Sequence, residues 1–190
     1  MDKPKKWTIE ELKNAVVNAE SINRYYKTVD DAFDVIIDRK TPELPGESWR
    51  KCNNHRYHTY EIHASNRGRI KVIKDGEETI CELCEEIAPE KPITSELFKS
   101  LIKRGEKHIG WLKAKIPGNK RCLGPYVYQM VADAWLADKC GPEMEIHHIT
   151  NDGYDNRPEN LTILKKSEHK KIQHYGLPEP RYYPGIRDKK

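Results

Sequence analysis

Two histidines, an asparagine and a third histidine near the C-terminal end of the chain have the types and spacing of a hydrolytic metal site. His147 and His148 are adjacent in a short apolar run, eleven residues separate them from Asn160, and eight more separate Asn160 from His169. Phosphodiester hydrolysis requires an activated water, neutralised phosphate oxygens and a stabilised departing alkoxide. Because neutral imidazole can accept a proton or bind a divalent cation, these residues predict a metal-dependent phosphodiesterase.

The elements that carry these residues decide which of them can act together. The pattern predicts a strand that ends at the histidine pair, a polar loop, a second strand from Asn160 and a helix with His169. Adjacent strand residues point to opposite faces, so one histidine should face a metal and the other the attacking water. A strongly apolar helix, predicted over 126–139 and ended by a Gly-Pro pair, should pack against this site.

The surrounding sequence resembles the HNH, or ββα-metal (His-Me finger), nuclease family. The resemblance covers about residues 126–175 and includes the loop 155–161, whose sequence is Asp-Asn-Arg-Pro-Glu-Asn-Leu. Members of that family carry a histidine pair, a loop of this form and a histidine on the following helix. The resemblance implies four roles: His147 and His169 as metal ligands, His148 as the general base, and Asn160 as the residue that braces the loop and orients the base.

The expected cofactor is one divalent cation, held by two histidines and completed by water and phosphate. Gln173 stands four residues after His169, where some members of the family place a third histidine. His174 lies about 140° around the helix from His169, so it is expected to contact phosphate or end the helix, with metal binding as the alternative. Mg²⁺ and Mn²⁺ are the physiologically plausible cations, whereas imidazole ligands favour Ni²⁺ or Zn²⁺.

A second resemblance concerns the segment that begins at Glu47. Apolar residues alternate on both sides of Asn66-Arg67-Gly68, which predicts a β-hairpin with a turn that tolerates positive φ. The Glu-Ser-Trp start, the Ser-Asn pair and the Gly-Arg pair are similar to a small module of phage and intron-encoded homing endonucleases. That resemblance implies DNA contact, with Arg67 and Arg69 as the expected contacts. The chain departs from the pattern by three additional histidines: His55, His58 and His63.

Three short helices are predicted in residues 1–41. Thr8 and Glu11 have the spacing of a capping box, and the middle helix carries the cations Arg24 and Lys27. The group resembles a helix-turn-helix that reads the major groove. The alternatives are a helical lid packed on the rest of the protein and a surface that recruits a protein such as phage packaging machinery.

The cysteines bear on zinc and on the cellular compartment. Cys81 and Cys84 could supply half of a structural zinc site, which Cys122 and Cys140 would complete only if the fold brought them together. An odd total of five cysteines argues against a secreted disulfide framework. No apolar run is long enough for a membrane span and no secretion signal is evident, so a cytoplasmic protein is expected, in a bacterial host cell if it is phage-encoded.

Basic residues cluster near the predicted site, although the formal net charge is only +4. Eight Lys or Arg stand against three acids from residue 165 to residue 190. Because phosphate binding depends on local clusters of cations, DNA is the expected partner. The expected phosphate contacts here are Arg157, Lys165, Lys166, Lys170 and Lys171.

These patterns predict an α+β protein with four parts. They are a helical DNA-binding element at 1–41, a β-hairpin-containing DNA-contact module at 46–116, an HNH nuclease domain at 117–176 and a basic tail at 177–190. The expected function is a DNA endonuclease of the phage homing or free-standing type. A monomer would favour nicking, and a homodimer would permit two cuts. The alternatives are a non-catalytic DNA-binding protein with a zinc-stapled ββα fold and a phage packaging-associated HNH nuclease.

Overall fold

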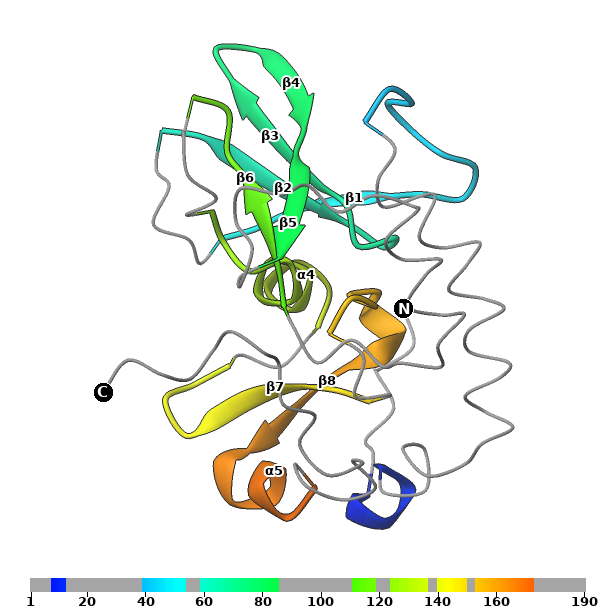
Figure 1. Ribbon diagram of the computed structural model, residues 1–190, viewed down its shortest axis with the longest axis vertical. Helices are drawn as coiled ribbons and strands as arrows, with labels where there is room; N and C mark the ends of the chain where they lie inside the picture. The colour runs from blue at the N-terminus through cyan, green and yellow to red at the C-terminus, as the bar shows by residue number, and fades with distance from the viewer. Residues whose placement is uncertain are drawn as a thin grey trace, which may run out of the picture.

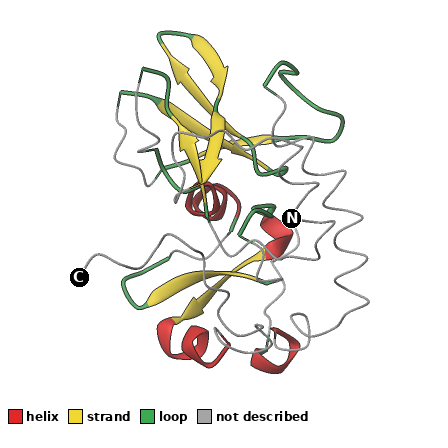
Figure 2. Ribbon diagram, in the orientation of Figure 1, coloured by secondary structure: helices red, strands yellow, loops and turns green. Residues whose placement is uncertain are grey.

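The computed structural model has the mixed α+β architecture expected from the sequence, with short helices and small antiparallel sheets (Figures 1 and 2). The structure describes residues 8–12, 39–53, 59–85, 111–118, 124–136, 140–149 and 153–172. Its elements are β1 (Trp49–Lys51), β2 (Glu61–Ser65), β3 (Ile70–Lys74), β4 (Glu77–Ile80), β5 (Glu82–Glu85), β6 (Leu112–Lys115), α4 (Val127–Trp135), β7 (Met144–His148), η1 (Pro158–Asn160), β8 (Leu161–Lys165) and α5 (Lys166–Ile172).

The predicted hairpin is confirmed as the centre of a four-stranded antiparallel sheet with the order β1-β2-β3-β4. Its turn closes with a hydrogen bond from Ser65 N to Arg69 O at 2.9 Å, and Gly68 has a φ of 81°, which the missing side chain permits. The alternating residues Ile62, Ala64, Ile70 and Val72 bury one face of the sheet. That face packs against α4.

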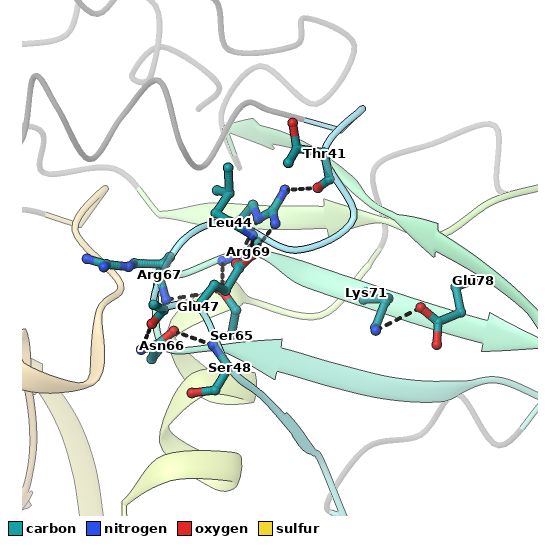
Figure 3. Close-up of polar contacts among 11 residues, drawn as sticks. Thr41, Leu44, Glu47, Ser48, Ser65, Asn66, Arg67, Arg69, Lys71 and Glu78 are labelled. Atoms are coloured by element: carbon teal, nitrogen blue, oxygen red, sulfur yellow. Dashed lines mark hydrogen bonds and ion pairs between the residues drawn. The ribbon is translucent and has the colours of Figure 1, made fainter.

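A network of polar contacts joins the start of β1 to the turn of the hairpin (Figure 3). Arg69 is fully buried, and its guanidinium donates to both carboxylate oxygens of Glu47, with Nε 2.8 Å from Oε1. Ser65 Oγ accepts from the backbone N of Arg67 at 3.1 Å and of Arg69 at 3.0 Å. Asn66 joins Ser48 N to Gly46 O.

The prediction that Arg69 contacts DNA is wrong. A side chain with no exposed surface cannot reach a phosphate, and its charge is already balanced by the buried carboxylate of Glu47. The neighbouring Arg67 differs, because its side chain is half-buried and points away from the ion pair (Figure 3). The role of Arg67 as a DNA contact stays a prediction.

Helix α4 packs between the four-stranded sheet and the two-stranded sheet of β7 and β8 (Figure 1). Val127, Met130 and Val131 are buried along one of its faces, as their spacing predicts. The helix ends at Trp135, earlier than the predicted residue 139, because Leu136 has extended backbone angles. Trp135 Nε1 donates to Ala64 O at 2.9 Å, which fixes the end of the helix against β2.

Residues on both sides of the predicted module boundary, between residues 116 and 117, belong to one hydrophobic core. One buried cluster contains Ile62 and Val72 of the sheet, Leu112 of β6 and Val131 of α4, together with Leu161 at the start of β8. Strand β6 pairs with β5 in a separate two-stranded sheet. The hairpin module and the β7-β8 pair are therefore packed through a common core.

The predicted capping box at the N-terminal end is confirmed. Thr8 N donates to Glu11 Oε2 at 2.8 Å, and Glu11 N donates to Thr8 Oγ1 at 3.2 Å. In the turn that follows, Leu12 is fully buried in a second apolar cluster with Ile149, Leu164 and Ile172. The first helical turn thus packs on β8 and α5, which agrees with the alternative of a helical lid for this part of the element.

Residues 1–7 and 13–38 of the N-terminal element, including Arg24 and Lys27, lie outside the described residues, as does His174. Their predicted roles stay predictions. Among the residues that the structure describes, no helix has the length and apolar character needed to cross a membrane.

Candidate active site

The β7-β8 pair and α5 bring three of the predicted site residues together. His147 lies opposite Thr162 and His148 opposite Leu161 in the antiparallel register. Helix α5 begins directly after β8, and it returns His169 to the side of β7. In Figure 1 the strand pair lies between α4 and α5, which contact it from either side. Both histidines of β7 are buried, with exposed fractions of 3% and 8%.

The two predicted metal ligands face each other. His169 Nε2 lies 3.1 Å from His147 Nδ1, and the two rings are inclined at 67°. Two imidazole nitrogens bound to one cation at about 2.1 Å, with an angle of about 90° to 110° between the bonds, lie about 3.0–3.4 Å apart. The observed separation falls in this range, so the pair fits a divalent cation without rearrangement of the backbone.

The protonation state of His147 is also compatible with a role as a metal ligand. Burial, together with smaller effects of the neighbouring rings of His169 and His148, lowers the pKa of His147 to about 3. The ring is therefore neutral at physiological pH and can offer a lone pair. Its Nε2 is buried without a hydrogen-bond partner in the part of the chain that the structure describes.

Glu145 is a site residue that the sequence analysis missed. Its Oε2 lies 2.6 Å from His169 Nδ1, on the opposite side of that ring from His147. An acceptor there places the proton of His169 on Nδ1, which leaves the lone pair of Nε2 directed at His147. The sequence feature that could have identified Glu145 is its position two residues before His147, on the same face of the strand.

Glu145 is not a third ligand of the same kind, because it contacts the far nitrogen of His169. Within the described ranges, no three His, Cys, Asp or Glu side chains are grouped so that they could hold a metal ion. At this point of the described chain, two imidazole nitrogens, those of His147 and His169, lie together.

The side chain of Asn156 contacts His148, the predicted general base. Its Oδ1 lies 3.1 Å from His148 Nε2, while its Nδ2 donates to Tyr154 O at 3.1 Å and to Gly153 O at 3.3 Å. Because two carbonyls fix the amide nitrogen, the oxygen must face the ring and accept from Nε2–H. The proton of neutral His148 then lies on Nε2 and the lone pair on Nδ1.

The orienting task was predicted for Asn160, and the direct contact with His148 is made by Asn156 instead. Asn160 braces the loop: its Nδ2 donates to Asp155 O at 2.8 Å. Its backbone oxygen accepts from Ile149 N at 2.8 Å, directly after the histidine pair. Asn160 therefore fixes the ends of the loop, and Asn156 fixes the ring.

An internal ion pair shapes the same loop. Asp155 accepts from Arg157 Nε and from its terminal nitrogen, both at 2.7 Å, and the side chain of Asp155 is 4% exposed. Arg157 was predicted as a phosphate contact, and in the structure its side chain pairs with Asp155 and stabilises the loop. The other predicted cations are exposed: Lys165, Lys166, Lys170 and Lys171.

The hairpin module supports this loop from the other side. A side chain added at Gly68 would meet the backbone carbon and Cβ of Asn156 at 3.6 Å. The β2-β3 turn therefore lies against the residue that holds His148. Tyr128 of α4 completes the surroundings, with its ring 5.5 Å from that of His148.

The predicted half zinc site does not form a ligand pair in the structure. Cys84 is disulfide-bonded, whereas Cys81 is a free thiol with an exposed fraction of 2%. Burial raises the pKa of the Cys81 thiol to about 12, which disfavours the thiolate that zinc would bind. The disulfide also differs from the reduced thiols expected from the sequence.

The arrangement can do two chemically distinct things. On one side of β7, the imidazoles of His147 and His169 converge on a point suited to a divalent cation. On the other, a buried histidine is held in the tautomer that can accept a proton. Comparisons of this chain with protein-family models, with curated proteins and with solved structures found no match.

Proposed function

We propose that the protein is a metal-dependent endonuclease that hydrolyses phosphodiester bonds in DNA through a C-terminal ββα-metal site of the HNH type. The observation that carries this proposal is the separation of two imidazole roles on adjacent residues. His147 faces His169 at 3.1 Å, whereas His148 is held by Asn156 at the same distance. A metal that only stapled the fold would have no use for a separately oriented second histidine.

The residues suggest how the reaction proceeds. Nδ1 of His148 takes a proton from the attacking water, and the hydrogen bond from Nε2 to Asn156 keeps the ring in the required tautomer. His147 and His169 would hold Mg²⁺, Mn²⁺, Ni²⁺ or Zn²⁺. When bound, such a cation supplies a Lewis acid that neutralises charge on the phosphate and on the departing 3′ oxygen. The exposed lysines of β8 and α5 attract the DNA backbone.

A plasmid assay tests the proposal. Supercoiled plasmid incubated with the wild-type protein and Mg²⁺, Mn²⁺ or Ni²⁺ should be converted to open circles, and excess chelator should prevent this. His169→Ala removes one imidazole of the metal pair and should abolish the conversion. Plasmid that is bound but uncut with every metal would support a non-catalytic DNA-binding protein instead. Linear products would indicate paired cuts by a homodimer.

Glu145 provides a test of the metal pair that does not depend on cleavage. Glu145→Gln should weaken divalent metal binding about 10- to 100-fold, because the His169 ring loses the carboxylate that orients it and increases its basicity. The measurement is calorimetric titration of the protein with Ni²⁺ or Zn²⁺.

The matched control is Glu143→Gln, which removes the same charge from an exposed position just before β7. It should leave the metal affinity unchanged. Equal losses in the two variants would mean that Glu145 acts only through general charge, and the proposed contact would have no special role.

Asn156 is expected to affect the reaction but not the metal. Asn156→Ala should lower the nicking rate about 10- to 100-fold, since His148 loses the acceptor that selects its tautomer. Metal affinity should stay at the wild-type level, because Asn156 lies away from the imidazole pair. Nicking rates and calorimetric titrations on the same preparations give both quantities, and an unchanged nicking rate would contradict the assigned role.

A further inference from the structure

A row of aromatic rings leads from the protein surface to His148. The ring centroids of Trp111 and Tyr126 are 6.4 Å apart, those of Tyr126 and Tyr128 5.4 Å, and those of Tyr128 and His148 5.5 Å. Trp111 directly precedes β6, and the two tyrosines stand at the start of α4. Because β6, α4 and β7 follow one another across the molecule in Figure 1, the row crosses from one layer to the next.

The exposure of these rings increases with distance from the site. His148 is 8% exposed, the two tyrosines are half-buried, and Trp111 is 46% exposed. Trp111 is the one exposed large hydrophobic side chain among the residues that the structure describes. Rings that served only as core packing would be expected to bury the tryptophan, whose large apolar surface gains most from removal from water.

A cation accompanies the row. Lys113 Nζ lies 4.4 Å from the centroid of the Tyr126 ring, and the backbones of Lys113 and Tyr126 are joined by an isolated β-bridge. The bridge fixes the first strand residues of β6 beside the start of α4. The surface therefore combines the exposed ring of Trp111 with a positive charge beside the half-buried Tyr126, and an exposed aromatic ring next to a cation is a combination that binds unpaired nucleic acid.

We propose that Trp111, at the exposed end of this row, is a stacking site for unpaired DNA bases near the scissile phosphate. This inference rests on the proposed function, since it is the assignment of His148 as the base that places the phosphate at the inner end of the row. An unpaired base stacks on the Trp111 ring, and Lys113 approaches the DNA backbone. The preferred substrate is accordingly DNA with unpaired nucleotides next to the cut, rather than continuous duplex.

Binding without cleavage tests the inference. Fluorescence anisotropy of labelled oligonucleotides, with the full chain and excess chelator, compares a duplex with the same duplex carrying a short unpaired stretch. The wild type should bind the unpaired form more tightly. Because stacking contributes about 1–3 kcal/mol per base, Trp111→Ala should weaken that binding roughly 5- to 150-fold and leave duplex binding unchanged. Trp111→Phe keeps a ring and should restore part of the affinity.

The outcomes separate this inference from the proposed function. A wild-type protein that nicks plasmid but binds both oligonucleotides equally would overturn the stacking site alone. Equal losses of Trp111→Ala on both oligonucleotides, or no loss on either, would also overturn it. A protein that prefers unpaired DNA through Trp111 but never cuts would overturn the nuclease and support the binding site.

Discussion

Alanine in place of His148 is expected to lower the nicking rate about 10²- to 10⁴-fold, the range that a positioned general base contributes. The reason is that the lone pair of Nδ1 is lost while the imidazole pair of His147 and His169 keeps its geometry. Divalent metal binding should therefore be retained. Nicking of supercoiled plasmid and calorimetric titration with Ni²⁺, carried out on the same preparation, measure the two effects.

The adjacent histidine is the sharpest control. His147→Ala should lose both metal binding and nicking, whereas His148→Ala should lose nicking alone. His63, which lies on β2 beside Glu61, serves as a distant control, and His63→Ala should leave both quantities unchanged. If the variants of His147 and His148 lost metal binding equally, the division of roles along β7 would be wrong.

Much of the local structure could be predicted because it depends on short-range patterns. Strand alternation placed His147 and His148 on different sides of β7, and the spacing to His169 allowed for one loop, one strand and one helical turn. The same reasoning gave the hairpin around Gly68, whose positive φ favours glycine. Each of these inferences needed only neighbouring residues.

The contacts that complete the site depend on how the loop closes, which spacing does not reveal. Asn156 and Asn160 occupy the same loop, and both are asparagines with buried amides. Only the folded loop shows that Asn156 reaches His148, because the carbonyls of residues 153 and 154 capture its amide nitrogen. The salt bridge between Asp155 and Arg157 holds that conformation.

Arg69 was misassigned for a related reason. A cation next to the hairpin turn resembles a DNA contact when only its neighbours are considered. Its partner, Glu47, stands 22 residues earlier in the chain, and the fold encloses both. A long-range pair of opposite charges cannot be recognised from a local sequence pattern, although Glu47 and Arg69 are both among the residues that carry the resemblance to the hairpin module.

The pair of Glu47 and Arg69 carries the largest expected effect on stability. Arg69→Ala should lower the free energy of unfolding by about 3–5 kcal/mol, because it leaves the carboxylate of Glu47 buried without its cation. Lys51→Ala is the matched control: its ion pair with Glu61 is exposed and screened by water, so the loss should be far smaller than that of Arg69→Ala. Denaturant unfolding, followed by circular dichroism, measures both values.

The charges of this pair, rather than its volume, should determine the loss. Replacing both partners, as Glu47→Leu with Arg69→Met, should recover most of the stability that Arg69→Ala loses, since no unpaired charge stays buried. Burial alone would raise the pKa of Glu47, but the hydrogen bonds from Arg69 and from the backbone of Leu44 outweigh it and hold the pKa below 4.5. The contribution of Glu47 is therefore fully present at pH values above the ordinary pKa of a glutamate and is lost as the pH falls through the lower pKa of the folded state. The double variant should lack this part of the acid sensitivity, and a wild-type acid dependence in that variant would mean that other carboxylates cause it.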